Sequence, residues 1–95
     1  PETEVVVTSG ATAGLYATLT ALVQPGDEVV LFEPCYDSYV PVIRLSGGVP
    51  VFVTLPYPDY TVDWDAVRRA VTPRTRLILV NTPHNPSGRI WTADD

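Results

Sequence analysis

An eight-residue run of polar, proline and glycine residues, Asn81 to Gly88, directly follows the apolar segment Leu77 to Val80. Within the run, the Asn85 amide can donate a hydrogen bond to a phenolate-like oxygen. Pro83 and Pro86 restrict the backbone on either side of Asn85. In open α/β sheets, ligands bind outside the carboxyl ends of the strands. The run therefore predicts a ligand-binding loop at a strand end, with Asn85 as its donor.

Two earlier loops carry residues suited to the same kind of ligand. Gly10 and Ala11 allow close approach to the backbone at the start of a predicted helix, where free N–H groups attract anions, and Thr12 adds a hydroxyl. Read alone, this segment is equally compatible with an ordinary strand-to-helix turn. Tyr36 follows Pro34 closely and can either lie on a planar heteroaromatic ring or simply cover the sheet edge.

The remaining reactive side chains do not form a second site. A lone loop histidine without a paired carboxylate is usually solvated, so we expect His84 to be exposed and not catalytic. Cys35 has no adjacent lysine or histidine to lower its pKa and is expected to be an inert thiol. One histidine and one cysteine cannot supply a typical zinc set, so no metal is expected. Asn81 is predicted to support its loop by hydrogen bonding, and Tyr39 to pack in a helix.

The elements that must position these loops alternate between strands and helices. Strands are predicted at Glu4–Thr8, Glu28–Phe32, Val49–Leu55 and Arg76–Val80, and helices at Leu15–Val23, Ser38–Leu45 and from an Asp63 N-cap through Val71. Helices between buried strands imply right-handed crossovers and a mainly parallel sheet. The expected fold is thus an α/β segment with the order β-α-β-α-β-α-β and helices on both faces. Its strand-end loops would share one edge of the sheet.

Composition excludes several functional classes. The chain has 95 residues, 45% of them hydrophobic, and a formal net charge of −5, with arginine as its only cationic residue besides His84 and no lysine. An acidic chain without a basic stripe is not expected to bind nucleic acid or an anionic membrane. A single cysteine suits a reducing, cytoplasmic setting. The chain starts without methionine and ends at a predicted helix start, so residues 1–95 are expected to be an internal fragment.

Three signatures occur in the order found in one enzyme family. They are Ser9-Gly10-Ala11-Thr12, then Gly26-Asp27-Glu28-Val29 with Glu33-Pro34-Cys35-Tyr36, then the run from Asn81 to Gly88. Together they resemble the middle of the large domain of class I/II, fold-type-I aminotransferases, which depend on pyridoxal 5'-phosphate (PLP). The segment Phe32 to Tyr39 is most similar to the branch that holds the kynurenine, methionine and N-succinyldiaminopimelate aminotransferases.

The resemblance implies a role for each loop. Gly10, Ala11 and Thr12 would hold the PLP phosphate, Tyr36 would stack on the pyridine ring, and Asn85 would bond the phenolic oxygen near the substrate carboxylate. The complete protein would exchange an amino group between an amino acid and a 2-oxo acid, as a homodimer. The family bonds PLP to a lysine, which this chain lacks. No residue here is therefore expected to be catalytic, and the 95-residue chain alone is expected to be inactive.

Three alternatives remain open at this point. A PLP-dependent C–S lyase or a related β-eliminating enzyme shares these cofactor loops. A non-catalytic α/β module that binds a nucleotide or another phosphate ligand is a second possibility, although residues 9–14 do not form the G-x-G-x-x-G pattern. The third is a non-catalytic structural piece of the parent protein, whose incomplete sheet would favour association.

Overall fold

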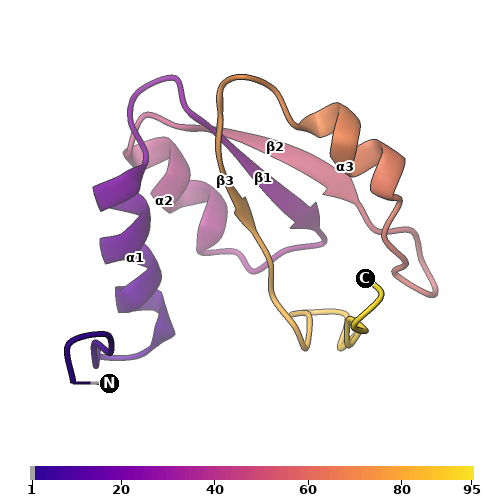
Figure 1. Ribbon diagram of the computed structural model, residues 1–95, viewed down its shortest axis with the longest axis horizontal. Helices are drawn as coiled ribbons and strands as arrows, with labels where there is room; N and C mark the ends of the chain where they lie inside the picture. Colours follow the sequence, from indigo (N-terminus) through magenta and orange to yellow (C-terminus); the bar gives the residue numbers. More distant parts are fainter. Residues whose placement is uncertain (1) are drawn as a thin grey trace.

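A three-stranded parallel sheet forms the centre of the computed structural model, which describes residues 2–95 (Figure 1). The strands are β1 (Glu28–Glu33), β2 (Val49–Thr54) and β3 (Thr75–Leu79), in the spatial order β2-β1-β3. The helices are α1 (Ala11–Leu22), α2 (Tyr39–Leu45) and α3 (Trp64–Ala70). The expected α/β class, with a parallel sheet and helical crossovers, is confirmed.

The central strand β1 is buried along nearly its whole length. Its first five residues are buried, including Glu28, and Val29, Val30 and Leu31 have no exposed surface. It pairs with β2 in the register Val30↔Val51 and with β3 in the register Val30↔Ile78. A strand with neighbours on both edges and helices on both faces needs apolar side chains at every position, which explains the continuous run in the sequence.

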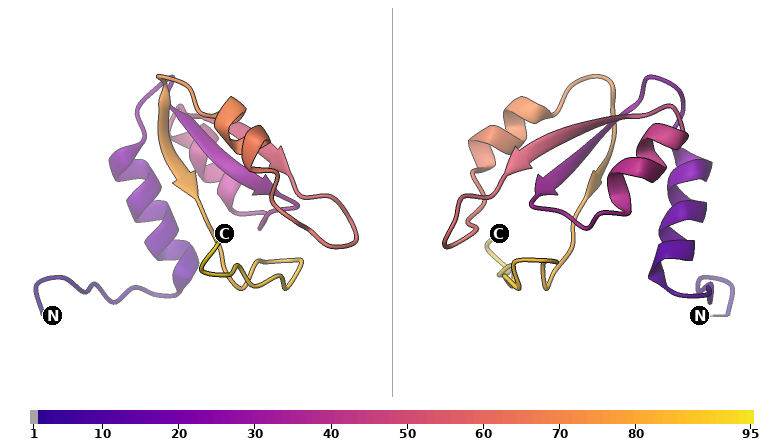
Figure 2. Two further views of the ribbon diagram at one scale, coloured as in Figure 1. Left: turned by 45° about the vertical axis from the view of Figure 1, so that its right-hand side comes forward. Right: turned by 180° about the vertical axis from the view of Figure 1, so that it is seen from behind.

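The helices cover opposite faces of the sheet because successive strand residues point to opposite sides (Figure 2). On one face, Val29 and Leu31 pack with Leu19 of α1 and Ile43 of α2. On the other face, the second cluster joins β1, β2 and α3 through Val30, Phe32, Val53, Leu55 and Val67. The two clusters fix β1 between the layers and so determine where its carboxyl end lies.

Two helix termini follow from local sequence chemistry. The Asp63 carboxylate accepts hydrogen bonds from the backbone N–H groups of Asp65 (2.9 Å) and Ala66 (3.1 Å), so the predicted N-cap of α3 is confirmed. The helix α2 ends in a turn in which Gly47, at φ 80°, and Gly48 donate to the carbonyls of Arg44 and Ile43. This is the Schellman pattern, and it satisfies the last carbonyls of α2.

An ionic cluster around the buried Glu28 carboxylate, with an exposed Arg74 side chain, fastens the amino end of the sheet. The Glu28 carboxylate accepts hydrogen bonds from the Thr72 hydroxyl and the Arg74 guanidinium, the latter with an Nε–Oε1 distance of 2.9 Å. These bonds, from Thr72 first and then Arg74, hold the pKa of Glu28 below its ordinary value of 4.5. A buried carboxylate needs such partners because burial alone disfavours its charge.

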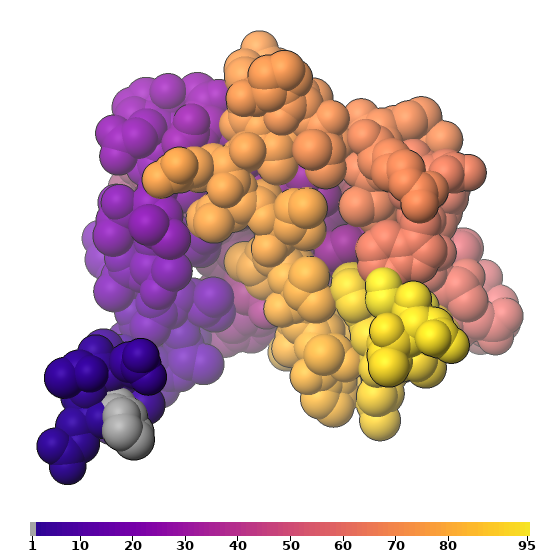
Figure 3. All heavy atoms as spheres, viewed as in Figure 1, coloured from indigo at the N-terminus to yellow at the C-terminus, as the bar shows by residue number. Residues whose placement is uncertain are grey.

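The predicted strand Glu4–Thr8 is wrong. Glu4 lies in a turn, residues 5–8 form no strand pairing, and Val5, Val6 and Val7 are exposed to 66%, 86% and 93%. The segment projects from the start of α1 away from the sheet, at the lower left of Figure 3. A β-branched sequence favours extended backbone, but a strand forms only where another strand supplies hydrogen-bond partners.

Among residues 2–95, no helix is long and apolar enough to cross a membrane.

Candidate functional site

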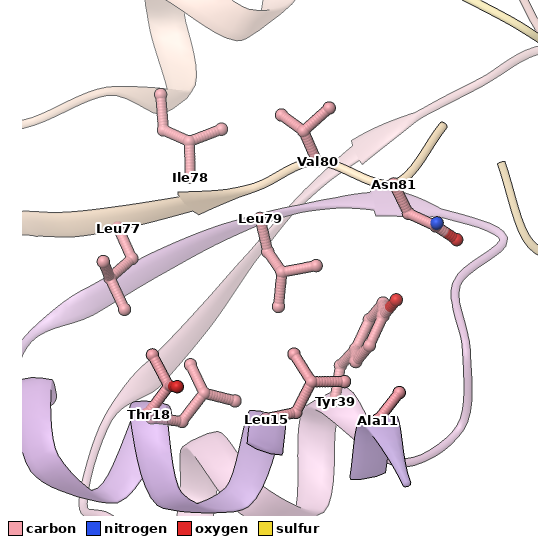
Figure 4. A pocket seen from close by; sticks show the side chains of 10 residues that line it. Ala11, Leu15, Thr18, Tyr39, Leu77, Ile78, Leu79, Val80 and Asn81 are labelled. Atoms are coloured by element: carbon pink, nitrogen blue, oxygen red, sulfur yellow. The ribbon is translucent and has the colours of Figure 1, made fainter. Parts of the chain in front are cut away.

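The loops singled out from the sequence gather at the carboxyl edge of the sheet. Because β1 and β3 are parallel, both strands end at this edge, and α1 begins beside it (Figure 1). A pocket of about 460 Å³ lies between α1 and β3, and Ala11, Tyr39 and Asn81 stand together at one end of it (Figure 4). The pocket is lined by Ala11, Leu15, Thr18, Leu19, Tyr39, Leu77, Ile78, Leu79, Val80 and Asn81.

The amino terminus of α1 has no side-chain cap. The N-cap residue Gly10 has φ 86°, a backbone conformation that favours glycine, and it supplies no side-chain cap. The first turn contains no acidic residue. Its N–H groups therefore carry the partial positive charge of a helix start without a side-chain partner. The exposed Thr12 hydroxyl in the same turn adds a further donor.

Tyr36 lies in the second loop, between β1 and α2. Hydrogen bonding with Ser38, and after it with Thr12, lowers the pKa of the Tyr36 phenol. The ring is partly buried and meets Tyr39 edge-on, with centroids 5.6 Å apart and planes at 79°. Tyr39 is itself buried in the core, as expected for a packing residue. The Tyr36 ring thus packs against Tyr39, which itself lines the pocket.

The neighbouring thiol is not activated. Burial raises the pKa of Cys35, and the Glu33 carboxylate adds to this rise. A thiol whose pKa is raised is a poorer nucleophile at neutral pH because less of it is thiolate. This agrees with the inert Cys35 expected from the sequence.

The third loop is held by hydrogen bonds within its own turn. The backbone N–H of Asn85 donates to Asn81 Oδ1 at 2.9 Å, which confirms the predicted supporting role of Asn81. Gly88, at φ 75°, donates its N–H to the His84 carbonyl at 2.6 Å. Among residues 2–95, no hydrogen bond holds the exposed side-chain amide of Asn85. The backbone of Asn85 is fixed while its amide stays available to a ligand.

The burial of the His84 side chain differs from the expectation drawn from the sequence. The sequence suggested a solvated side chain, but His84 is only 4% exposed. Its Nδ1 lies 2.7 Å from the Ser87 hydroxyl. Burial lowers the pKa of His84, and hydrogen bonding to the Phe32 backbone offsets part of that effect. Ser87, three residues after His84, was the only sign in the local sequence of a hydrogen-bond partner for the ring. The interaction with Phe32 joins residues that are too far apart in the chain to be predicted from the sequence.

The structure brings two of the predicted loops together directly. Ala11 at the start of α1 and Asn81 at the start of the third loop line the same pocket. Asn85 reaches this edge through its bond to Asn81. An uncapped helix start, an aromatic ring and an unbonded amide donor are groups that could interact with a planar phosphorylated ligand.

Comparison with known proteins decides the family. The model of the family described as "Aminotransferase class I and II" matches residues 1–95. The chain belongs to the class I and II aminotransferases. The enzymes of this family depend on PLP, and the resemblance drawn from the loop signatures is confirmed.

Individual relatives support the assignment to this family. The chain is 49% identical to a methionine aminotransferase of Escherichia coli, covering 99% of this chain and 24% of that protein. It is 52% identical to a probable N-succinyldiaminopimelate aminotransferase of Mycobacterium tuberculosis, covering 100% of this chain and 24% of that protein. This aminotransferase chain therefore spans about a quarter of the length of these relatives.

Solved structures agree with the fold. The structure of N-succinyldiaminopimelate aminotransferase from Mycobacterium tuberculosis superposes with a TM-score of 0.94 at 51% identity, over 99% of this chain and 25% of that one. The structure identified with a methionine aminotransferase function in Escherichia coli gives a TM-score of 0.90 at 51% identity, over 93% of this chain and 23% of that one. At this identity, the likeness covers both the fold and the loops that the fold positions.

Proposed function

We propose that the protein containing this chain is a PLP-dependent aminotransferase that transfers an amino group between an amino acid and a 2-oxo acid. Residues 1–95 would form part of its PLP-binding large domain. The observation that carries the proposal is the uncapped start of α1, whose Ala11 lines the same pocket as Asn81, the residue that holds the Asn85 backbone. Bound there, PLP would supply an electron sink for reactions at the amino-bearing carbon.

The described residues fit the parts of this cofactor. Gly10, Ala11 and Thr12 would hold the phosphate because the first turn of α1 offers N–H groups and a hydroxyl without a competing carboxylate. The Tyr36 ring, which packs against the pocket residue Tyr39, would cover one face of the pyridine ring. The free amide of Asn85 would donate to the phenolic oxygen and border the substrate carboxylate.

The setting proposed for the whole protein is cytoplasmic and homodimeric, with an amino acid and a 2-oxo acid as its substrates. The single Cys35 is consistent with a reducing compartment. The names of the relatives, which refer to methionine and to N-succinyldiaminopimelate, suggest both amino acids as donors to try first.

The decisive experiment separates the phosphate from the ring of the cofactor. In the full-length protein, Thr12→Ala removes a donor to a charged group, a change of about 1.5–3 kcal/mol, so PLP affinity should fall about ten- to a hundredfold. Affinity for pyridoxal, which has no phosphate, should stay the same. Thr20→Ala is the matched control because the Thr20 hydroxyl bonds the Tyr16 carbonyl (2.7 Å) within the same helix.

Activity then tests the reaction class. Purified full-length protein is supplied with PLP, an amino acid donor and a 2-oxo acid acceptor, and formation of the new amino acid is measured. Turnover that depends on the acceptor supports an aminotransferase. Release of ammonia and a 2-oxo acid without any acceptor would instead assign the β-eliminating alternative. Equal loss of PLP and pyridoxal binding in Thr12→Ala would contradict the phosphate site.

A further inference from the structure

We infer that Trp91 is a positioning residue that fixes the Asn85 loop against the carboxyl end of β1, an inference that rests on the function proposed for that loop. Trp91 follows the loop in the chain, and the cofactor contacts proposed above make no use of it. Its ring contacts β1 and α3, and its backbone bonds the loop itself. One side chain therefore joins the loop to two elements of the core.

The indole ring of Trp91 packs into the core on the α3 face of the sheet. It meets the Phe32 ring edge-on, with centroids 4.9 Å apart and planes at 90°. It also meets the Trp64 ring, with centroids 5.9 Å apart and planes at 86°. Phe32 is the last buried residue of β1, and Trp64 is the first residue of α3. The last residues of the chain, yellow in Figure 3, accordingly lie beside α3.

The backbone of Trp91 closes the loop on itself. Its N–H donates to the Thr82 hydroxyl at 3.0 Å, so the segment that leaves the loop is bonded to the segment that enters it. Between these two ends, the Asn85 N–H donates to Asn81 Oδ1. A loop closed in this way keeps its own shape, but these bonds do not set its place relative to the sheet. The ring of Trp91 supplies that connection.

The hydrogen bonds of the sheet do not extend this far. Pairing of β1 with β3 ends at Leu31↔Leu79, and the chain then leaves the sheet and forms the loop. Phe32 lies one residue beyond the last pair. The contact between Phe32 and Trp91 therefore continues the connection between β1 and the departing chain after the ladder has ended, at the edge where Asn85 would present its amide.

The indole nitrogen takes no part in this role. Trp91 Nε1 is buried and has no hydrogen-bond partner among residues 2–95. A buried donor without a partner destabilises the fold, so the position depends on the aromatic ring and not on its N–H. Phenylalanine, which keeps an aromatic ring and removes the unpaired donor, should therefore replace Trp91 with little loss.

Cofactor binding by the full-length protein tests the positioning role. Trp91→Leu should weaken affinity for PLP and for pyridoxal alike, by about tenfold, because both contain the phenolic oxygen that Asn85 would meet. Thr12→Ala, in contrast, should affect PLP alone. Trp91→Phe should stay within about twofold of wild type. Ile90→Ala, at a neighbouring side chain that is 68% exposed, is the matched control and should change neither affinity.

A double-mutant cycle tests whether Trp91 acts through Asn85. In the Asn85→Ala background, which has already lost the amide donor, Trp91→Leu should weaken PLP binding no further. An equal loss in both backgrounds would overturn the inference. If Trp91→Leu does not fold, Thr82→Val takes its place in the cycle, because it removes the acceptor of the Trp91 N–H at an exposed position and should weaken PLP binding about two- to tenfold. Thr82→Ser keeps the hydroxyl and should match wild type.

Hydrogen exchange in the cofactor-free protein keeps the test independent of the proposed function. Trp91→Leu should speed exchange of the Asn85 N–H about tenfold, because the loop opens more readily without its anchor. Val67→Ala, which removes buried methyl groups from the same core cluster, should leave that exchange unchanged. Unchanged Asn85 exchange in Trp91→Leu contradicts the inference, whatever the binding results. Faster exchange in a protein that binds no PLP supports the anchor and refutes the proposed function alone.

Discussion

Substituting Gly48 by alanine should disrupt the packing between the end of α2 and the segment that leads into β1. A Cβ atom at Gly48 would stand 2.6 Å from Val23 Cγ1 and 3.0 Å from Ile43 Cγ2, whereas ordinary contact begins at 3.4 Å. It would also stand 3.2 Å from the Ile43 carbonyl, the same oxygen that accepts the Gly48 N–H. The new methyl group cannot move away from Val23 without loosening the turn that ends α2.

The magnitude follows from two opposing effects. Overpacking of a core costs about 1–3 kcal/mol, whereas replacing glycine by alanine stabilises by about 0.4–1 kcal/mol through the unfolded chain. Gly48→Ala should therefore destabilise by about 1–2 kcal/mol. Val23→Ala removes two methyl groups at a site that is 3% exposed, a loss of about 1.6 kcal/mol before any cavity effect. In the double variant the added methyl group and the removed methyl groups compensate in volume. The decrease in its free energy of unfolding should therefore be about 1 kcal/mol smaller than the sum of the decreases in the two single variants.

Urea unfolding of the wild-type chain and the three variants measures these values, with helical circular dichroism and tryptophan fluorescence as two probes. Trp64 and Trp91 report on the opposite face of the sheet, so agreement of the probes tests two-state behaviour. Gly88→Ala is the control: its φ of 75° penalises alanine, yet no atom lies within 4 Å of the new Cβ. The stability lost in Gly88→Ala and the stability lost in Val23→Ala should simply add in the double variant. Additive losses for Gly48→Ala and Val23→Ala would refute the steric argument.

Two further predictions concern charged groups. The pKa of Glu28 is lowered on folding, so its contribution to stability is complete above its unfolded pKa and is lost as pH falls through the folded value, below about 4.5. Glu28→Gln should be less stable than wild type at pH 7, and its melting temperature should fall less steeply than that of wild type below pH 4.5. Parallel profiles of melting temperature against pH would contradict this. Asp63→Ala should lower stability by about 1 kcal/mol, or about 4–8 °C in melting temperature, through loss of the α3 cap. Asp63→Asn keeps the accepting oxygen and should match wild type, and an equal loss in both would assign the effect to charge.

Local patterns in the sequence were sufficient to predict much of the fold. The continuous apolar run of β1, the Asp63 cap and the two glycines after α2 each act through neighbours within a few residues. The helix α2 begins at Tyr39, before Pro41, because a proline in the first turn removes no hydrogen bond that the helix needs. Such features depend on local chemistry, which a single sequence contains.

The two failures both depend on distant partners. The residues from Glu4 to Thr8 have strand composition, but their pairing needs a second strand that local sequence does not specify. The burial of His84, at 4% exposure, is a tertiary feature that the local sequence does not specify. For the site, the loops and their donors were identifiable by residue type, whereas the pocket shared by Ala11 and Asn81 required the three-dimensional arrangement.

The Glu28 cluster separates two tasks of the sheet. Its hydrogen bonds to Thr72 and Arg74 clamp the amino ends of β1 and β3, while two of the loops proposed to bind PLP leave the carboxyl ends of the same strands. Substitutions in those loops leave the clamp untouched, and a weakened clamp does not alter which groups face the ligand. A sheet arranged in this way can change its ligand chemistry at one end while its folding stability is maintained from the other.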